Sequence, residues 1–283
     1  SSDLGEFSRI YQSFKKTNIC FDANITGTVN VFNFALKNNI RVIYSATSAS
    51  LGNNGCDMNL SPYSFSKAKN VELLENLKNP GIRMSFWTHF VTQPTTTSVM
   101  LLWAVPFMVT AEGQSHDFAA FTLTSMVLFG FVTGPLIGSW CAKHPERRGL
   151  LVYAVVALTS LTWVFIVSQN QVLPAWVLYI SFLLISIGGP ASMIAFDFSK
   201  EIVPKQRLGS ANGFANVGGF LATFVMMFLT GVVIDFVHEG SSNPERYTVQ
   251  AFQYGFAAQL SVVVIGITFF TVERRKQIGR AHV

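Results

Sequence analysis

Long apolar segments dominate the chain after residue 85 and limit what it can fold into. Each segment is about 20 residues or longer, the length that an α-helix needs to cross the hydrocarbon core of a bilayer. Helices of a soluble bundle would show a polar face at the helical period, and these segments show almost none. The sequence therefore predicts six membrane-spanning helices, at residues 86–109, 118–141, 149–168, 172–196, 209–235 and 251–271.

The composition hides a sharp division of the chain. Its 283 residues are 50% hydrophobic and only 12% charged, which is too apolar for a typical soluble protein. Residues 5–81 nevertheless read as ordinary polar sequence, so we expect one domain there and a membrane domain at residues 82–277. The cysteines Cys20, Cys56 and Cys141 have no metal-ligand spacing and suggest no disulfide framework, so we expect no metal site.

Basic residues gather on one side of the predicted spans. Because Lys and Arg accumulate in cytoplasmic loops, both ends of the six-span block are predicted to lie in the cytoplasm, in a plasma or inner membrane. The pI of about 9.2 then reflects this topology, and no nucleic-acid partner is expected. The opposite side carries only Arg246, whereas the basic side carries Arg83, Lys143, Arg147, Arg148, Lys200, Lys205, Arg207, Arg274, Arg275 and Lys276.

Glycines repeat every four residues in two of the spans. The second span carries Gly130, Gly134 and Gly138, and the fifth begins with Gly209 and Gly213. Such stripes let helix backbones approach closely in lipid, where the hydrophobic effect does not drive association. The stripes therefore predict close helix packing, and the alternative is that they only reflect how common glycine is in membrane helices.

Two segments of this block resemble a known family. The loop GPLIGSWCAKHPERRG, residues 134–149, is similar to the Gly-rich loop of major facilitator superfamily transporters, although it lacks the usual acidic residue. Residues 194–222, IAFDFSKEIVPKQRLGSANGFANVGGFLA, resemble the junction between the tenth and eleventh helices of such transporters. The resemblance covers residues 82–275 and implies the C-terminal half of the fold. It further implies secondary active transport of a small-molecule solute in a lipid bilayer by alternating access, without a cofactor, and inactivity without the first six helices.

The basic loop predicts a conformational latch. Arg147 and Arg148 can pair with a carboxylate at a helix end, and Asp197 at the end of the fourth span is the best candidate partner. Breaking and re-forming such a pair would bias the inward-open and outward-open states. The alternative, held equally open, is that these arginines only set the topology.

Polar residues deep in the spans are costly in lipid and therefore indicate function. The candidates for a transport cavity are His89, Gln93 and Thr96 in the first span and Asn212 and Asn216 in the fifth. The family resemblance implies that substrate binds near midplane between two halves. His89 has an ordinary pKa near neutrality, which suits a proton carrier. The alternative is a histidine near the interface that is hydrogen-bonded to the backbone.

The first eighty residues predict a different fold. Helical spacing at residues 23–39, the apolar run IRVIYSA at residues 40–46 and a second helix at residues 63–78 indicate a helix-strand-helix fragment of a parallel sheet. Tyr63 and Lys67 lie four apart, on one face of the second helix. An ammonium group near a phenol lowers the phenol pKa towards that of a general base.

This pattern resembles the extended short-chain dehydrogenase/reductases, especially NAD-dependent nucleotide-sugar epimerases and dehydratases. The resemblance rests on Tyr63 and Lys67, on the motif N-x-x-G-T-x-N at residues 24–30, and on Thr47 after the predicted strand. It implies that Tyr63 is the catalytic base, that Lys67 assists it and holds the NAD(P) ribose, and that Thr47 orients substrate, with Ser45 or Ser48 as alternatives to Thr47. The Gly-rich dinucleotide fingerprint is missing, so a Rossmann-like fragment that is catalytically incomplete is predicted.

The two resemblances and the chain ends together predict a chimera. Residues 1–4 and 278–283 look like translated sequencing adapter, and the seam is placed near Asn79–Ile82. Glycine stripes left uncovered in such a fragment would favour non-native self-association. A membrane-tethered reductase is the remaining alternative.

Overall fold

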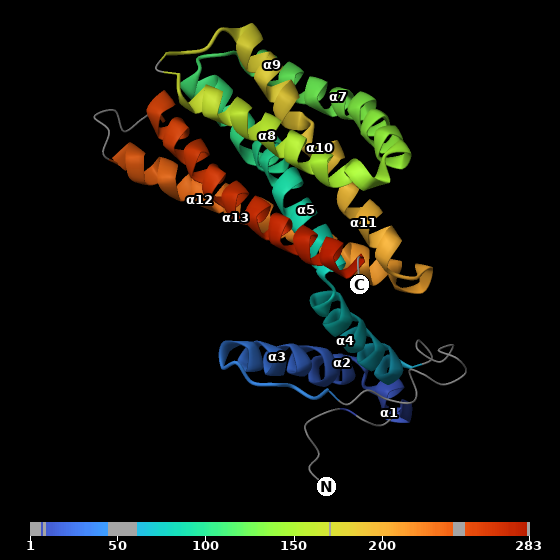
Figure 1. The fold of residues 1–283 in the computed structure, drawn as a ribbon. Coiled ribbons are helices and arrows are strands. Elements are labelled where there is room, and N and C mark those ends of the chain that lie inside the picture. The colour runs from blue at the N-terminus through green and yellow to red at the C-terminus, as the bar shows by residue number, and fades with distance from the viewer. Residues whose placement is uncertain (1–6, 8–9, 45–60, 170, 240–246, 282–283) are drawn as a thin grey trace. The chain divides into compact units, whose positions relative to one another are not determined.

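The computed structural model describes residues 7, 10–44, 61–169, 171–239 and 247–281 (Figure 1). The chain divides into two compact units, Ser1–Lys78 and Asn79–Val283. The boundary lies beside the predicted seam at residues 79–82, and it separates the polar part of the sequence from the apolar part.

The N-terminal unit is helical wherever it is described in regular structure. Helix α4 begins where the sequence predicts, because Pro62 occupies its first turn and the hydroxyl of Ser61 accepts a hydrogen bond of 3.1 Å from the backbone N–H of Ser64. The helices are α1 (Ile10–Lys15), α2 (Thr17–Phe21), a π-helical turn (Asp22–Thr26), α3 (Gly27–Lys37) and α4 (Pro62–Lys78).

A buried polar network joins the π-helical turn to α4. The side-chain amide of Asn70 donates to the backbone carbonyl of Asn24 over 2.7 Å, and that of Asn24 donates to the Ser66 hydroxyl over 3.2 Å. All three residues are buried. Because a buried polar group is costly unless it is hydrogen-bonded, this network fixes how the two segments meet.

The strand predicted at residues 40–46 is not found in its described part. Residues 40–44 have no strand structure, and residues 45–46 lie outside the described residues. A strand is defined by backbone hydrogen bonds to a neighbouring strand, and the described residues supply no such neighbour. The described part of the unit therefore does not form the predicted α/β fragment.

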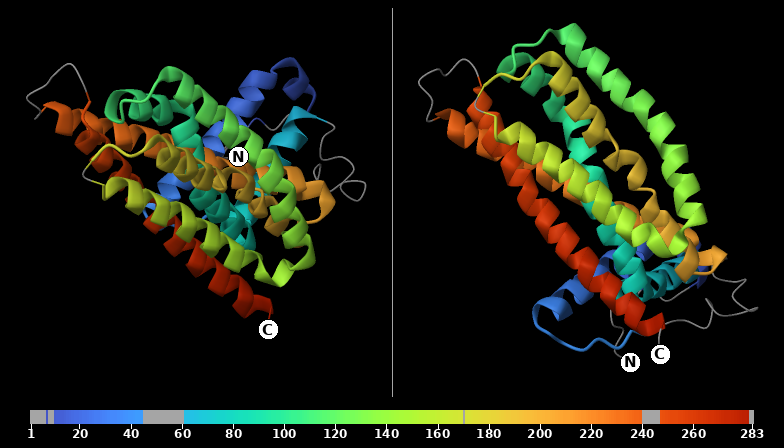
Figure 2. Two further views of the ribbon diagram at one scale, coloured as in Figure 1. Left: turned by 90° about the horizontal axis from the view of Figure 1, so that it is seen from above. Right: turned by 45° about the horizontal axis from the view of Figure 1, so that its top comes forward.

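The second unit contains six helices that are long and apolar enough to cross a membrane, as predicted. Figure 2 shows these long helices running side by side from two further directions. We call the end that holds Arg83, Arg148 and Arg274 the basic end, and the other the opposite end. The spans are Pro80–Ala111, His116–Lys143, Pro145–Val167, Ala175–Ile202, Lys205–Val237 and Val249–Gly279.

The first and fourth spans are discontinuous, whereas the others are built around single long helices. The first contains Pro94 and Pro106, and proline removes a backbone donor and disturbs the helix. The fourth is interrupted around Gly188–Ala191, which contains a Gly-Gly-Pro sequence. The helices are α5 (Pro80–Ser98), α6 (Ala104–Pro106), α7 (His116–Lys143), α8 (Arg148–Val167), α9 (Ala175–Ser186), α10 (Gly188–Ala191), α11 (Ile194–Ile202), α12 (Leu208–Glu239) and α13 (Val249–Ala281), with π-helical turns at Val99–Trp103 and Phe107–Ala111.

Helix α5 is central to the unit, because it packs against α10, α11, α12 and α13. Large apolar side chains are also left on the surface, among them Phe131 at 72% exposed and Phe224 at 68% exposed. Such exposure would be unfavourable in water, whereas hydrocarbon accommodates it. The surface therefore agrees with the membrane placement that the sequence predicts.

The glycine stripes are packed only in part. A Cβ on Gly130 or Gly134 would lie 3.7 or 3.8 Å from the Pro190 ring, so these two glycines face α10. A Cβ on Gly138, Gly209 or Gly213 would have no atom within 4 Å in the described part of the chain. The predicted close packing is thus found at Gly130 and Gly134 and at no other member of the two stripes.

Candidate functional site

The predicted cavity residues of the first span lie against α12. His89 is only 2% exposed, and its Nδ1 has no hydrogen-bond partner among the described residues. A Cβ on Gly219 would overlap Nδ1 of His89 and lie 2.7 Å from Oε1 of Gln93. The absence of a side chain at Gly219 therefore allows α12 to approach these two polar residues.

The fourth span also reaches His89. The imidazole ring lies 5.2 Å from the ring of Phe196 in α11, measured between centroids. Three spans thus meet at one buried histidine. The alternative prediction was a hydrogen bond between this histidine and the backbone, and Nδ1 forms no such bond with the described residues.

Thr96 ties the first span to the fourth. Its hydroxyl donates a hydrogen bond of 2.7 Å to the backbone carbonyl of Ile185, in the last turn of α9. Carbonyl groups in a last turn lack helical partners, so a side-chain donor is favourable there. At the same crossing, a Cβ on Gly188 would overlap the backbone carbonyl of Thr92 and lie 2.8 Å from Oγ1 of Thr96. Thr96 is therefore engaged in helix packing.

The predicted residues of the fifth span are half-buried. Asn212 and Asn216 lie on α12, and Asn216 precedes Gly219 by three residues. Oδ1 of Asn212 is buried and has no hydrogen-bond partner among the described residues. Helices α5 and α12, which pack against each other, thus each bury one polar atom, His89 Nδ1 and Asn212 Oδ1, that has no hydrogen-bond partner in the described chain.

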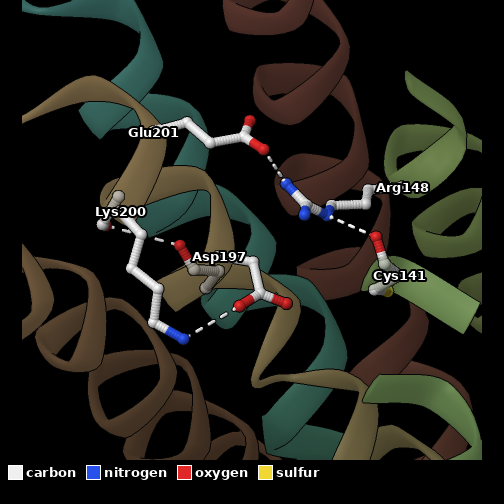
Figure 3. Close-up of polar contacts among 7 residues, drawn as sticks. Cys141, Arg148, Asp197, Lys200 and Glu201 are labelled. Atoms are coloured by element: carbon white, nitrogen blue, oxygen red, sulfur yellow. Dashed lines mark hydrogen bonds and ion pairs between the residues drawn. The ribbon is translucent and has the colours of Figure 1, made fainter. Parts of the chain in front are cut away.

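At the basic end, Arg148 forms a bridge between three helices (Figure 3). Its Nε donates to the backbone carbonyl of Cys141 in α7 over 3.1 Å, and its Nη1 pairs with the carboxylate of Glu201 in α11. The residue is nearly buried, at 9% exposed. A charged donor that is removed from water in this way forms a strong hydrogen bond.

The partner predicted for this latch is different in the structure. Asp197 pairs with Lys200 of its own helix at 3.1 Å, as Figure 3 shows, and the carboxylate that reaches Arg148 belongs to Glu201, one turn farther along α11. Arg147 is exposed and lies 3.4 Å from Glu146, its neighbour in the chain. Of the two predicted arginines, only Arg148 therefore links helices.

Sequence reasoning missed a second ion-pair cluster at the basic end. Arg83 of α5 pairs at 2.7 Å with Glu273 of α13, and Lys276 contacts the same carboxylate at 2.8 Å. Glu273 is only 5% exposed. A lone acidic residue beside three basic ones in VERRK was the available signal.

The predicted enzyme residues fall partly outside the described chain. Tyr63 and Lys67 lie on α4, half-buried and buried respectively, whereas Thr47 and its alternatives Ser45 and Ser48 lie outside the described residues. Nζ of Lys67 is 4.5 Å from the centroid of the Tyr44 ring. Within the described chain, no three His, Cys, Asp or Glu side chains are grouped to hold a metal ion.

Comparison with known proteins identifies the membrane unit. No curated protein and no solved structure matches the chain. The family model of the Major Facilitator Superfamily matches residues 86–282, which includes most of the tail predicted to be adapter and leaves out the N-terminal unit. The dehydrogenase resemblance and the chimera remain predictions. The match spans more than half of the sequence, and it agrees with six apolar helices, so the chain belongs to the Major Facilitator Superfamily.

Proposed function

We propose that the membrane unit is part of a transporter that moves a small solute across a bilayer by secondary active transport with alternating access. One observation carries the proposal: in a chain of this family, two helices that pack against each other, α5 and α12, each bury a polar side-chain atom that has no hydrogen-bond partner among the described residues. Burying a polar group within a membrane costs free energy, and polar residues that are kept there mark functional sites. Their presence on two packed helices therefore supports a solute pathway.

The residues proposed to line the pathway are His89, Gln93, Asn212 and Asn216. They offer neutral hydrogen-bonding groups, which suit recognition of a polar solute. Thr96 has a positioning role in this proposal, because its hydroxyl is already bonded to Ile185. His89 is also the candidate proton carrier.

The latch at the basic end is proposed to act through Arg148. Its ion pair with Glu201 joins α8 to α11, while its bond to the Cys141 carbonyl joins α8 to α7. A rearrangement that separated α8 from α11 would break this pair and expose both charged groups to solvent. The pair would then favour the state in which it is formed.

Uptake by proteoliposomes tests the transport proposal. The chain is reconstituted and assayed with a panel of radiolabelled sugars, amino acids and organic ions, with and without a proton gradient. His89→Ala should abolish any uptake that is found, whereas His116→Ala, at an exposed histidine outside the contact, should leave it unchanged. Uptake that is equal in His89→Ala and the parent would contradict the proposed pathway.

The proposed orientation places the basic end in the cytoplasm of a plasma or inner membrane. The ten basic residues on that side support it. Two variants measure this orientation in intact cells. Each carries one cysteine, Gln171→Cys or Lys143→Cys, in a chain whose own three cysteines have been replaced. A membrane-impermeant maleimide should label the first and spare the second, and the reverse pattern would invert the topology.

For the N-terminal unit, we propose as a second function that it binds NAD(P). The support is the pair Tyr63 and Lys67, four residues apart on α4. Quenching of protein fluorescence by NAD(H) or NADP(H) in the detergent-solubilised chain measures it. Failure of all four dinucleotides to bind at millimolar concentration would remove the enzyme proposal and the membrane-tethered reductase with it.

A further inference from the structure

Glu112 is a buried carboxylate at the opposite end of the membrane unit. It directly follows the first span and is only 3% exposed. Its Oε2 accepts a hydrogen bond of 2.6 Å from the backbone N–H of Leu173, which lies between α8 and α9. The proposed pathway and latch make no use of this residue.

The surroundings of Glu112 are apolar. Phe107, Met108, Ala111 and Leu173 are all buried in one cluster at this end. No ion pair or hydrogen bond joins Glu112 to another charged or titratable side chain in the described part of the protein. Among the side chains that the structure describes, the titratable groups of the neighbouring elements at this end are His116 and Asp117 of α7, Tyr179 of α9, Asp235 of α12, and Tyr247 and Tyr254 before and in α13.

Burial raises the pKa of the Glu112 carboxyl above its ordinary value, against the opposing effect of the Leu173 hydrogen bond. A carboxyl with a raised pKa in one conformation binds its proton more tightly there than when it is solvated. The stabilisation of that conformation is fully present below the ordinary glutamate pKa, and it is lost as the pH rises through the raised value. Acidification therefore favours the conformation in which Glu112 is buried.

We propose that Glu112 is the proton-responsive group of a clasp that joins residues 112–115 to residues 171–174 and closes this end of the bundle in acid. When Glu112 is deprotonated, a charge with no cationic partner in the described chain favours solvent, and the clasp opens. When it is protonated, the carboxyl returns to the apolar cluster and still accepts from Leu173. The clasp concerns the conformation of this end, and it is independent of which solute the unit carries.

An uncharged tether on the same connection provides a matched control. The side-chain amide of Gln253 in α13 donates to the backbone carbonyl of Gln169. Glu112 therefore holds this connection at Leu173 and Gln253 holds it at Gln169, but only Glu112 titrates. Removing Gln253 should loosen the connection at every pH, whereas removing the charge of Glu112 should abolish the pH response.

Distances between spin labels measure the closure. Labels are attached at His116→Cys and Gln171→Cys, both exposed positions, in the full chain with Cys20, Cys56 and Cys141 replaced by alanine. The chain is held in lipid nanodiscs and measured by double electron–electron resonance at a series of pH values from about 4 to about 8, starting near the ordinary glutamate pKa. Replacing His116 also removes the nearest histidine in the sequence as a source of any response.

The expected result is a rise of about threefold or more in the ratio of closed to open distances on acidification. Glu112→Gln should stay closed at every pH value, and Gln253→Ala should be more open throughout while keeping the response. An unchanged ratio in the parent, or an equal pH response in Glu112→Gln, would overturn the proposal. A full pH titration of the parent gives a readout that needs no Glu112 variant: its midpoint must lie above the pKa of an exposed glutamate.

Discussion

In the membrane unit, a residue without a side chain can determine how closely two helices approach, just as a polar residue can join them by a hydrogen bond. Gly219 has no polar side chain, yet it determines how closely α12 approaches His89 and Gln93. Gly213, on the same helix, faces open space. Two glycines that look alike in sequence therefore have different structural roles, and substitution separates them.

Gly219→Ala should destabilise the unit by about 1–3 kcal/mol, because the added methyl group overlaps His89 and forces α5 and α12 apart. Gly213→Ala is the matched control, and its effect should stay within about 0.5 kcal/mol. Thermal unfolding in detergent, followed by tryptophan fluorescence, measures both. Equal unfolding midpoints for the two variants would show that the α5–α12 contact is not as close as described.

The two adjacent arginines also differ in role. Arg148→Ala removes a bond to the Cys141 carbonyl and the pair with Glu201, and hydrogen bonds of charged groups contribute about 1.5–3 kcal/mol. Arg147→Ala removes only an exposed contact with Glu146, and such pairs contribute about 0–1 kcal/mol.

The same unfolding assay in detergent should therefore show a clear fall in the midpoint for Arg148→Ala and little change for Arg147→Ala. If Arg147→Ala were the more damaging of the two, Arg147 would be the latch residue and the assignment of Arg148 would be wrong.

At the level of elements, the two discontinuous spans contact each other. The first span carries prolines, the fourth carries a Gly-Gly-Pro sequence, and the hydroxyl of Thr96 bonds to Ile185 between them. Continuous helices satisfy their own backbone groups in lipid, so interruptions need partners from neighbouring helices. The hydrogen bond from Thr96 of α5 to Ile185 of α9 supplies one such partner.

Adjacent glycines at the crossing of α5 with α10 offer a test of the element packing. Gly188→Ala should disrupt it, because the methyl group would overlap the Thr92 carbonyl, and backbone does not move aside easily. Gly189→Ala should be tolerated, because its Cβ would lie 3.6 Å from Cγ2 of Thr96, an ordinary contact. The yield of monodisperse protein after detergent extraction reports the difference, and a reversal of the order would contradict the described crossing.

At the level of the whole molecule, the chain consists of two compact units of different composition. The unit Asn79–Val283 contains the six apolar helices of the described chain, and the unit Ser1–Lys78 buries a polar network. Insertion into lipid depends on the apolar length of each span and not on the polar residues that precede it.

Deletion of residues 1–78 should therefore leave membrane integration unchanged. Extraction of membranes with alkaline carbonate measures this, and the truncated chain should remain in the pellet, as should the parent. Release of either chain into the supernatant would contradict the six-span assignment. The full chain in the same experiment serves as the control.

The features that were predicted correctly from the sequence each depend on one continuous segment of the chain. Six spans were predicted because apolar length is compared directly with bilayer thickness, and the start of α4 was predicted because Pro62 suits the first turn of its own helix. The predicted strand at residues 40–46 depended instead on a partner strand, which no local pattern supplies.

The tertiary structure alone decided which residues meet. Sequence singled out His89, Gln93 and Arg148, yet the approach of Gly219 to the first two and the choice of Glu201 over Asp197 follow from how helices cross. The burial of Glu112 follows in the same way from the packing of two connections. The hydrophobic length of a span is a property of one segment, so the spans could be predicted from the sequence. Contacts and burial depend on pairs of segments far apart in the chain, so the arrangement of the site could not.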